Sequence, residues 1–140
     1  MTYYILSQVK VEKIRKLGIL KNIFNFLDLE ANIDIAKSLL DQKKYQEVID
    51  TCNLILSENS NSIDALKLIG KSFLAANKIE DARLYFNKVL NIKSDDYEVM
   101  KELGNTYQET GDSVTAKKYY RKALSIKSNY SAALTNLGSL

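Results

Sequence analysis

The amino-acid sequence repeats itself every 34 residues, and this period constrains the fold more than any other feature. Stepping along the chain by 34 aligns small residues with small ones and large apolar residues with large ones, without insertion or deletion over three units. The clearest series are Ala36, Gly70, Gly104 and Gly138; Leu39, Phe73 and Tyr107; Cys52, Phe86 and Tyr120; and Leu56, Leu90 and Leu124. A fixed period of this length indicates an array of similar supersecondary units.

Each unit has the pattern of two amphipathic helices. In the third unit, residues at the spacing of one helical face occur twice, first at Met100, Leu103, Gly104 and Tyr107, and then at Ala116, Tyr120, Ala123 and Leu124. Between them, Gly111 can take the left-handed conformation that ends a helix, and Asp112 can cap the next helix. Asn77 suits the same turn in the second unit. The absence of proline and the scarcity of glycine also favour helices.

This pattern resembles the tetratricopeptide repeat family. Residues 97–130 match its motif best, with Leu103-Gly104, Tyr107, Gly111, Ala116, Tyr120 and Ala123. Residues 29–62 depart from the motif at Asn32, Val48 and Cys52, and Ser60, Ser94 and Ser128 stand where the family usually has proline. The resemblance implies an all-α, right-handed superhelical solenoid of antiparallel helix pairs, with three full repeats and a partial fourth.

The repeat boundaries divide the chain into five parts. We expect an N-terminal helical cap segment at 1–28, repeats at 29–62, 63–96 and 97–130, and the start of a truncated fourth repeat at 131–140. Within the cap segment, the apolar pattern predicts a helix over about 19–27 that covers the first repeat. The fourth unit stops within its first helix, so either the sequence is a fragment of a longer protein or the open end pairs with another chain.

The composition argues against catalysis. The chain has no histidine and a single cysteine, so it lacks the residues for a Ser-His-Asp or Cys-His nucleophile and for a common zinc site. No glycine-rich phosphate loop is present. We expect Cys52 to be a small core residue and Asp95-Asp96 to precede and cap a helix. The sequence therefore predicts a protein that is not an enzyme and has no metal or cofactor.

Charge and hydropathy indicate which class of partner and which cellular compartment to expect. A net charge of +3 is too small to indicate a nucleic-acid partner, and no apolar stretch is long enough to span a membrane. The N-terminus does not have the pattern of a signal peptide, and the lone thiol fits a reducing compartment. We therefore expect a cytoplasmic protein whose partner is a protein or peptide.

The resemblance also implies where a partner binds. In this family, peptides lie in the concave groove formed by the first helices and contact the second, fifth and ninth positions of each unit. Carried over, these positions are Glu30, Ile33 and Lys37; Asp64, Lys67 and Lys71; Glu98, Lys101 and Asn105; and Ala132, Thr135 and Ser139. Lys37, Lys67, Lys71 and Lys101 would form a basic strip that attracts acidic residues or a C-terminal carboxylate. Alternatively, the pairs Asp64–Lys67 and Glu98–Lys101 simply belong to a solvated face.

Family members that hold a C-terminal carboxylate use a lysine and an asparagine four residues apart, followed by an asparagine 31 residues later. Lys101, Asn105 and Asn136 fit that spacing, while the two further basic residues of the motif would lie beyond residue 140. The predicted peptide-binding residues are thus Lys37, Lys67, Lys71, Lys101, Asn105 and Asn136. We expect a non-catalytic interaction scaffold, or alternatively a structural module that forms homo-oligomers through its open C-terminal repeat or N-terminal cap.

Overall fold

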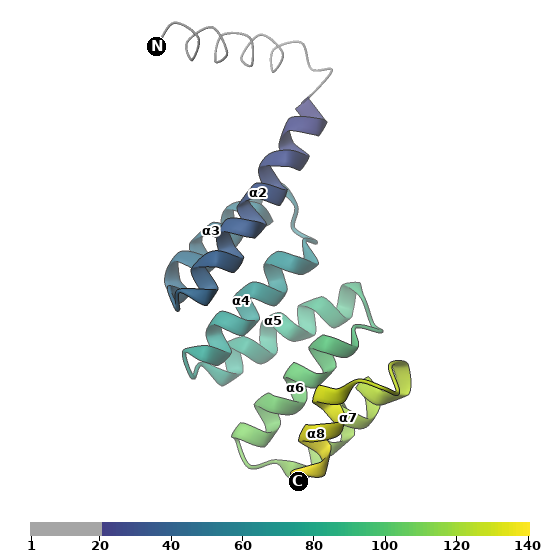
Figure 1. Cartoon of the computed structure of the whole chain (residues 1–140). Coiled ribbons are helices and arrows are strands. Elements are labelled where there is room, and N and C mark those ends of the chain that lie inside the picture. Colours follow the sequence, from purple (N-terminus) through teal and green to yellow (C-terminus); the bar gives the residue numbers. More distant parts are fainter. Residues whose placement is uncertain (1–20) are drawn as a thin grey trace, which may run out of the picture.

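The computed structural model describes residues 21–140, which form seven helices and contain no strand. The first helices of the successive repeats are α2 (Lys21–Asp41), α4 (Ile63–Ala75), α6 (Tyr97–Glu109) and α8 (Ser131–Gly138), and the second helices are α3 (Tyr45–Glu58), α5 (Ile79–Ile92) and α7 (Ser113–Ile126). Helices α2, α4 and α6 each run antiparallel to the second helix that follows them, and the pairs stack in sequence order (Figure 1). The predicted all-α solenoid of helix pairs is confirmed.

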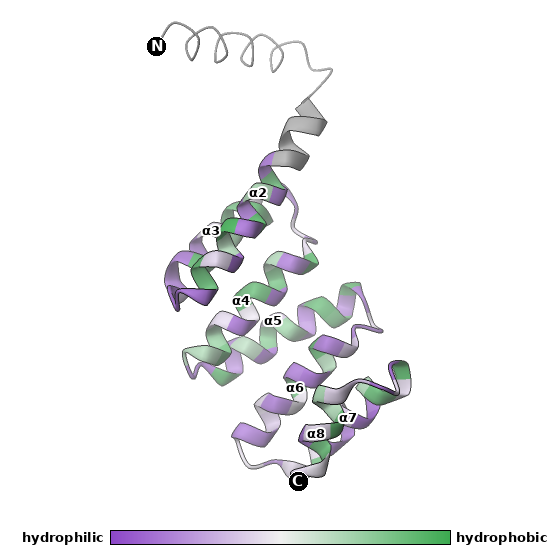
Figure 2. Cartoon of the chain, in the orientation of Figure 1, coloured by the Kyte–Doolittle hydropathy of each residue, from purple (hydrophilic) through white to green (hydrophobic). Residues whose placement is uncertain are grey.

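Each pair stacks on the next because the helices are amphipathic. Hydrophilic and hydrophobic residues alternate along the helices of the array (Figure 2). One group of buried residues joins α2, α3 and α4, a second joins α4, α5 and α6, and a third joins α6, α7 and α8. Each pair therefore completes its core with the first helix of the next pair, as expected for repeats that cannot bury their apolar faces alone.

The N-terminal part of the array differs from the sequence prediction. The helix expected over about 19–27 and the first helix of the first repeat are one continuous helix, α2, from Lys21 to Asp41. No glycine or proline occurs between these residues, so nothing in the local sequence ends a helix near 28. The rest of the predicted cap segment, residues 1–20, lies outside the described residues.

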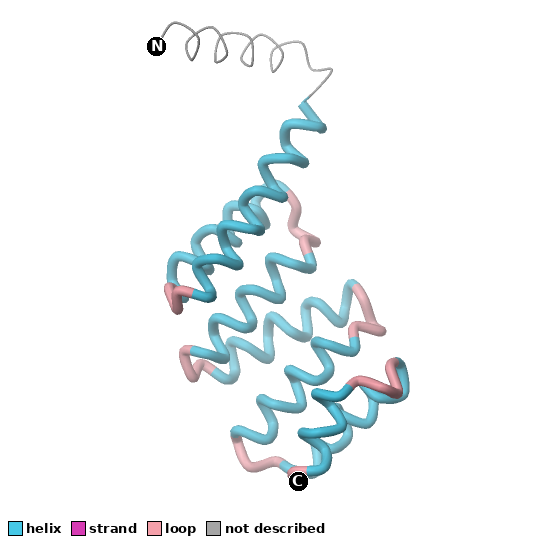
Figure 3. Tube along the Cα trace, viewed as in Figure 1, coloured by secondary structure: helices cyan, strands magenta, loops and turns pink. Residues whose placement is uncertain are grey.

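Short loops join the helices (Figure 3), and three of these turns use a left-handed residue. Gly111 has a φ of 80° and Asn77 a φ of 59°, as the sequence predicted, while Lys43 takes the same conformation in the first repeat with a φ of 60°. Asp112 caps α7 by accepting a hydrogen bond from the Thr115 amide at 3.0 Å. The turn chemistry of the repeat was thus visible in the sequence, except at Lys43, whose residue type disfavours this conformation.

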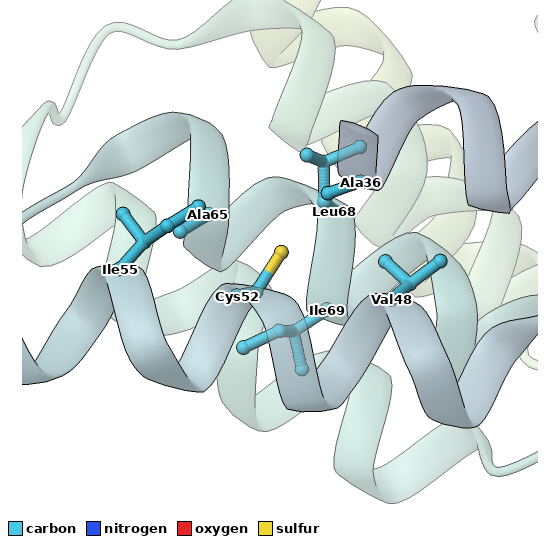
Figure 4. Close-up of a cluster of buried hydrophobic side chains, with 7 residues drawn as sticks. All are labelled: Ala36, Val48, Cys52, Ile55, Ala65, Leu68 and Ile69. Atoms are coloured by element: carbon cyan, nitrogen blue, oxygen red, sulfur yellow. The ribbon is translucent and has the colours of Figure 1, made fainter. Parts of the chain in front are cut away.

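Two glycines of the series, Gly70 and Gly104, lie in tight contact with an aromatic ring of the paired helix. A Cβ atom added at Gly104 would lie 2.4 Å from the Tyr120 ring, and one added at Gly70 would lie 2.6 Å from the Phe86 ring. The first repeat has a different solution, with Ala36 and Cys52 both fully buried at the equivalent positions (Figure 4). Burial raises the pKa of the Cys52 thiol to about 12, so Cys52 is the core residue that the sequence predicted.

Candidate functional site

The predicted peptide-binding residues lie on α2, α4, α6 and α8, and we call the surface of these four helices the first-helix face. Helix α2 contacts α4, and α6 contacts α8. We refer to the boundary between α2 and α4 as the first junction, that between α4 and α6 as the second, and that between α6 and α8 as the third. The three junctions occupy equivalent places in the repeat, so their side chains can be compared position by position.

The first junction contains a cavity of about 420 Å³. Four of the positions predicted to face a ligand line it, namely Glu30, Ile33, Lys37 and Asp64. Its apolar lining is formed by Leu29, Ile33 and Ile55, and its carboxylates come from Glu30, Asp34 and Asp64. The Lys37 ammonium lies 3.7 Å from the Asp34 carboxylate, and both side chains are exposed.

The second junction is closed by an ion-pair cluster centred on Lys67. Its Nζ donates hydrogen bonds to Asp96 Oδ2 at 3.1 Å and to Glu98 Oε2 at 2.7 Å. Asp96 is only 3% exposed and also caps α6 by accepting a hydrogen bond from the Val99 amide at 3.0 Å, as expected for a residue that precedes a helix. Lys93 adds a weaker contact, with its Nζ 3.9 Å from Asp96 Oδ2.

The ion-pair cluster shifts the pKa values of Lys67 and Glu98. Burial opposes the charge of Lys67, but the hydrogen bonds to Glu98 and Asp96 outweigh burial and raise the pKa of Lys67 above its usual value. The hydrogen bond from Lys67 lowers the pKa of Glu98. The pairing of Lys67 with Asp64 that we considered from the sequence is replaced by a contact with the next repeat, because the second junction places two carboxylates around the ammonium.

The third junction brings together Lys101, Asn105 and Asn136, the three residues of the predicted carboxylate-binding motif. Asn136 Nδ2 donates to Asn105 Oδ1 at 2.8 Å, and the Tyr120 hydroxyl donates to the same oxygen at 2.9 Å. The carboxylate bound here belongs to the chain itself, since Glu102 accepts hydrogen bonds from Lys101 Nζ at 2.6 Å and from Asn105 Nδ2 at 3.0 Å. The pairing of Lys101 with Glu98 is therefore also replaced.

Glu102 was not singled out by sequence analysis. It follows Lys101 directly and lies three residues before Asn105 on the same helix, a spacing at which helical side chains meet. Both Lys101 and Glu102 are mostly buried, with 16% and 13% of their side chains exposed. The spacing to Asn105 was the available signal, but residues adjacent in a helix do not normally face each other, so Lys101 could not be recognised as a partner from the sequence.

The basic strip is thus largely neutralised by the chain's own carboxylates. Lys67 and Lys101 are paired with mostly buried or partly buried acids, and Lys37 contacts Asp34 in solvent. Lys71 is half-buried on α4 and, among the side chains of residues 28–140, no carboxylate lies within ion-pair distance of its ammonium. Within the described chain there is also no group of acidic or cysteine side chains that could hold a metal ion, and no helix long and apolar enough to cross a membrane.

Sequence comparison supports the repeat assignment. The family model described as tetratricopeptide repeat matches residues 98–130. A search of curated proteins found no similar sequence. Structural similarity is much broader and extends over most of the chain.

Three of the similar solved structures illustrate this breadth. MamA is 19% identical over 87% of this chain and 70% of its own, with a TM-score of 0.72. The first tetratricopeptide domain of Spaghetti (RPAP3), solved with an HSP90 peptide, is 16% identical over 79% and 88%, with a TM-score of 0.74. The Sgt2 domain from Aspergillus fumigatus is 18% identical over 80% and 76%, also with a TM-score of 0.74. Residues 98–130 thus match the tetratricopeptide repeat model, and the described residues share the fold of these solved structures.

Proposed function

We propose that the chain is a non-catalytic interaction scaffold that binds an extended segment of a partner protein on its first-helix face. The observation that carries this proposal is the cavity of the first junction, which is lined by Glu30, Ile33, Lys37 and Asp64. These are positions at which members of the family contact their peptides. The RPAP3 domain, which shares the fold, was solved with a bound peptide, and this supports the same use of the face here.

The chemistry of the face indicates which lysines are available to a ligand. Lys67 and Lys101 already have internal carboxylate partners, so an acidic ligand would have to displace Asp96 and Glu98 from Lys67, or Glu102 from Lys101. Breaking such contacts removes about as much interaction as the ligand gains. Lys71 has no carboxylate within ion-pair distance among the described side chains, although its charge acts on Glu98 from further away. We propose Lys71 as the residue that meets an acidic group or a C-terminal carboxylate of the partner.

Site-specific photo-crosslinking tests the proposal directly. A benzophenone amino acid is placed at Lys71 on α4 and, as a control, at the exposed Lys118 on α7, and the protein is irradiated in cell extract. We expect a defined partner protein to be cross-linked from position 71 and not from position 118. Cross-linking of the same proteins from both positions would contradict binding on the first-helix face.

The same experiment addresses the alternative of a self-assembling structural module. A cross-linked product with twice the mass of the chain, together with a sedimentation coefficient that rises with concentration, would favour that alternative. Variants at Lys67 are unsuitable for either test, because removing its ammonium leaves the nearly buried carboxylate of Asp96 without its main partner. Lys71 can be changed without breaking any ion pair found in the described chain.

A further inference from the structure

We propose that the cavity of the first junction binds the side chain of a lysine or arginine from the partner. This inference rests on the proposed function and specifies the chemistry of the segment bound there. It reverses the expectation of an acidic ligand for this part of the face. The argument comes from comparing the three junctions of the same chain.

In the second junction, the position equivalent to this cavity contains ion pairs between side chains of the chain itself. There, the ammonium of Lys67 lies between the carboxylates of Asp96 and Glu98. Subtracting 34 gives the equivalent residues of the first junction, which are Ile33, Ser62 and Asp64, and all three line the cavity. One carboxylate is retained as Asp64, whereas the lysine is replaced by isoleucine. The first junction thus lacks the internal cation that closes the second.

Charge around the cavity supports the same conclusion. Among the side chains that the structure describes, its lining contains three carboxylates, those of Glu30, Asp34 and Asp64, and one ammonium, that of Lys37. Asn59, which also lines the cavity, stands where the second junction has Lys93. The first junction has therefore lost the cations of Lys67 and Lys93, keeps that of Lys71 as Lys37, and has gained one carboxylate on α2, Asp34, where α4 has Leu68. A positively charged group is the ligand that this arrangement favours.

The shape and polarity of the cavity fit a long basic side chain. Leu29 and Ile33, which are partly exposed, provide an apolar surface for an aliphatic stem, and the carboxylates provide partners for its charged end. A volume of about 420 Å³ is in the range of ligand pockets, roughly 300–1,000 Å³. It accommodates a lysine or arginine together with an adjoining apolar residue.

The third junction provides a contrast within the same molecule. Lys101 occupies the position of Lys67, but Tyr130 and Ala132 stand at the positions of the two acids. The ammonium then binds Glu102 on its own helix. A lysine at this position of the repeat therefore forms an ion pair with a nearby carboxylate of the chain. Of the three junctions in the described chain, only the first has carboxylates but no lysine at this position.

Three matched peptides test the inference by NMR titration of the full chain labelled with ¹⁵N. The probe is a heptapeptide with the sequence Gly-Ser-Leu-Lys-Leu-Ser-Gly, and the comparison peptides carry Nε-acetyl-lysine or glutamate in place of lysine. Acetylation keeps the aliphatic stem and removes the charge, while it adds a small acetyl group. We expect the lysine peptide to shift the amide signals of Ile33 and Asp64 and to bind about tenfold more tightly than the acetylated peptide.

Protein variants separate this cavity from general charge effects. Asp64→Asn should lower the affinity for the lysine peptide to about that for the acetylated peptide. Ile33→Lys places a lysine where the second junction has Lys67, and it should abolish the preference for the lysine peptide. Asp50→Asn, an exposed acid on α3, is the matched control and should leave binding unchanged. Asp64→Asn leaves the apolar lining intact, so its result does not depend on whether Ile33→Lys folds.

The possible failures are distinguishable. Tighter binding of the glutamate peptide on the first-helix face would overturn the inference about charge while leaving the proposed function in place. Equal binding of the lysine and acetyl-lysine peptides, signal shifts away from the first junction, or no binding of the lysine peptide would each overturn the inference. The proposed function itself is decided by cross-linking from position 71.

Discussion

At the scale of single residues, the core depends on pairs of positions 16 residues apart in each repeat. Gly70 faces the ring of Phe86, and Gly104 faces the ring of Tyr120, whereas the first repeat combines Ala36 with Cys52. A larger residue on one helix is thus matched by a smaller one on the other. The glycine series was readable from the sequence, but the compensation between Ala36 and Cys52 required the packing of the pair to be known.

This packing predicts the effect of adding one methyl group. The Cβ of Gly104→Ala would lie 2.4 Å from Cε1 of Tyr120, a ring that is fully buried and has little room to move. Overpacking of this kind lowers the free energy of unfolding by about 1–3 kcal/mol, measured by urea denaturation. Gly138→Ala is the control, because its added Cβ meets nothing within 4 Å.

The cause can be checked in a second background. In a Tyr120→Cys variant, which copies the arrangement of the first repeat, the same Gly104→Ala change should cost much less, giving a coupling energy of about 0.5–3 kcal/mol between the two positions. Equal costs in both backgrounds would show that contact with the ring is not the reason for glycine.

At the scale of elements, contacts between neighbouring pairs were the part of the structure that sequence reasoning could not supply. The lysines were correctly placed on first helices, but Lys67 pairs with residues 29 and 31 positions further along the chain. Arg83 of α5 likewise donates to the Thr106 carbonyl near the end of α6 at 2.9 Å and lies over the Tyr107 ring. Such contacts depend on how the pairs stack, whereas caps and turns depend only on nearby residues.

The link between α4 and α6 predicts a pH-dependent contribution to stability. The pKa of Glu98 is lowered by Lys67, so its stabilising effect is present above the pKa of the unfolded chain and is lost as pH falls through the lower, folded value. The pKa of Lys67 is raised, so its effect is present below its unfolded pKa and is lost as pH rises through the higher, folded value. The pair is therefore fully effective between about pH 5 and pH 10.

Glu98→Gln should lower the free energy of unfolding at pH 7 by about 0.5 kcal/mol, a small effect because half of the Glu98 side chain is exposed and its charge is screened. The difference in free energy of unfolding between Glu98→Gln and wild type should become smaller as the pH is lowered from 7 to 3. Urea denaturation at each pH measures this difference. The exposed Glu58→Gln is the control and should match wild type throughout. A deficit of Glu98→Gln that stays constant with pH would rule out the ionised pair as its source.

At the scale of the whole molecule, the 34-residue period was sufficient to predict the solenoid. The starts of α4, α6 and α8 at residues 63, 97 and 131 repeat it without deviation. The period does not determine what each junction contains, because single substitutions at equivalent positions, such as Ile33 in place of Lys67, leave one junction open and close another. Repetition therefore predicts the fold, and departures from it mark where the three junctions differ in their side chains.

The stacked architecture also predicts how stability is distributed along the array. Each pair packs only on its neighbours, so α4, α5 and α6 are supported from both sides, whereas α8 has eight residues and a single buried one, Ala133. Amide hydrogen exchange should be slowest in the three central helices and fastest in α8. Val89→Ala, in the central core, should speed exchange in all described helices, while Ala133→Gly should affect only α8 and its contacts with α6 and α7. Uniform exchange along the chain would instead indicate that the array opens as one cooperative unit rather than from its end.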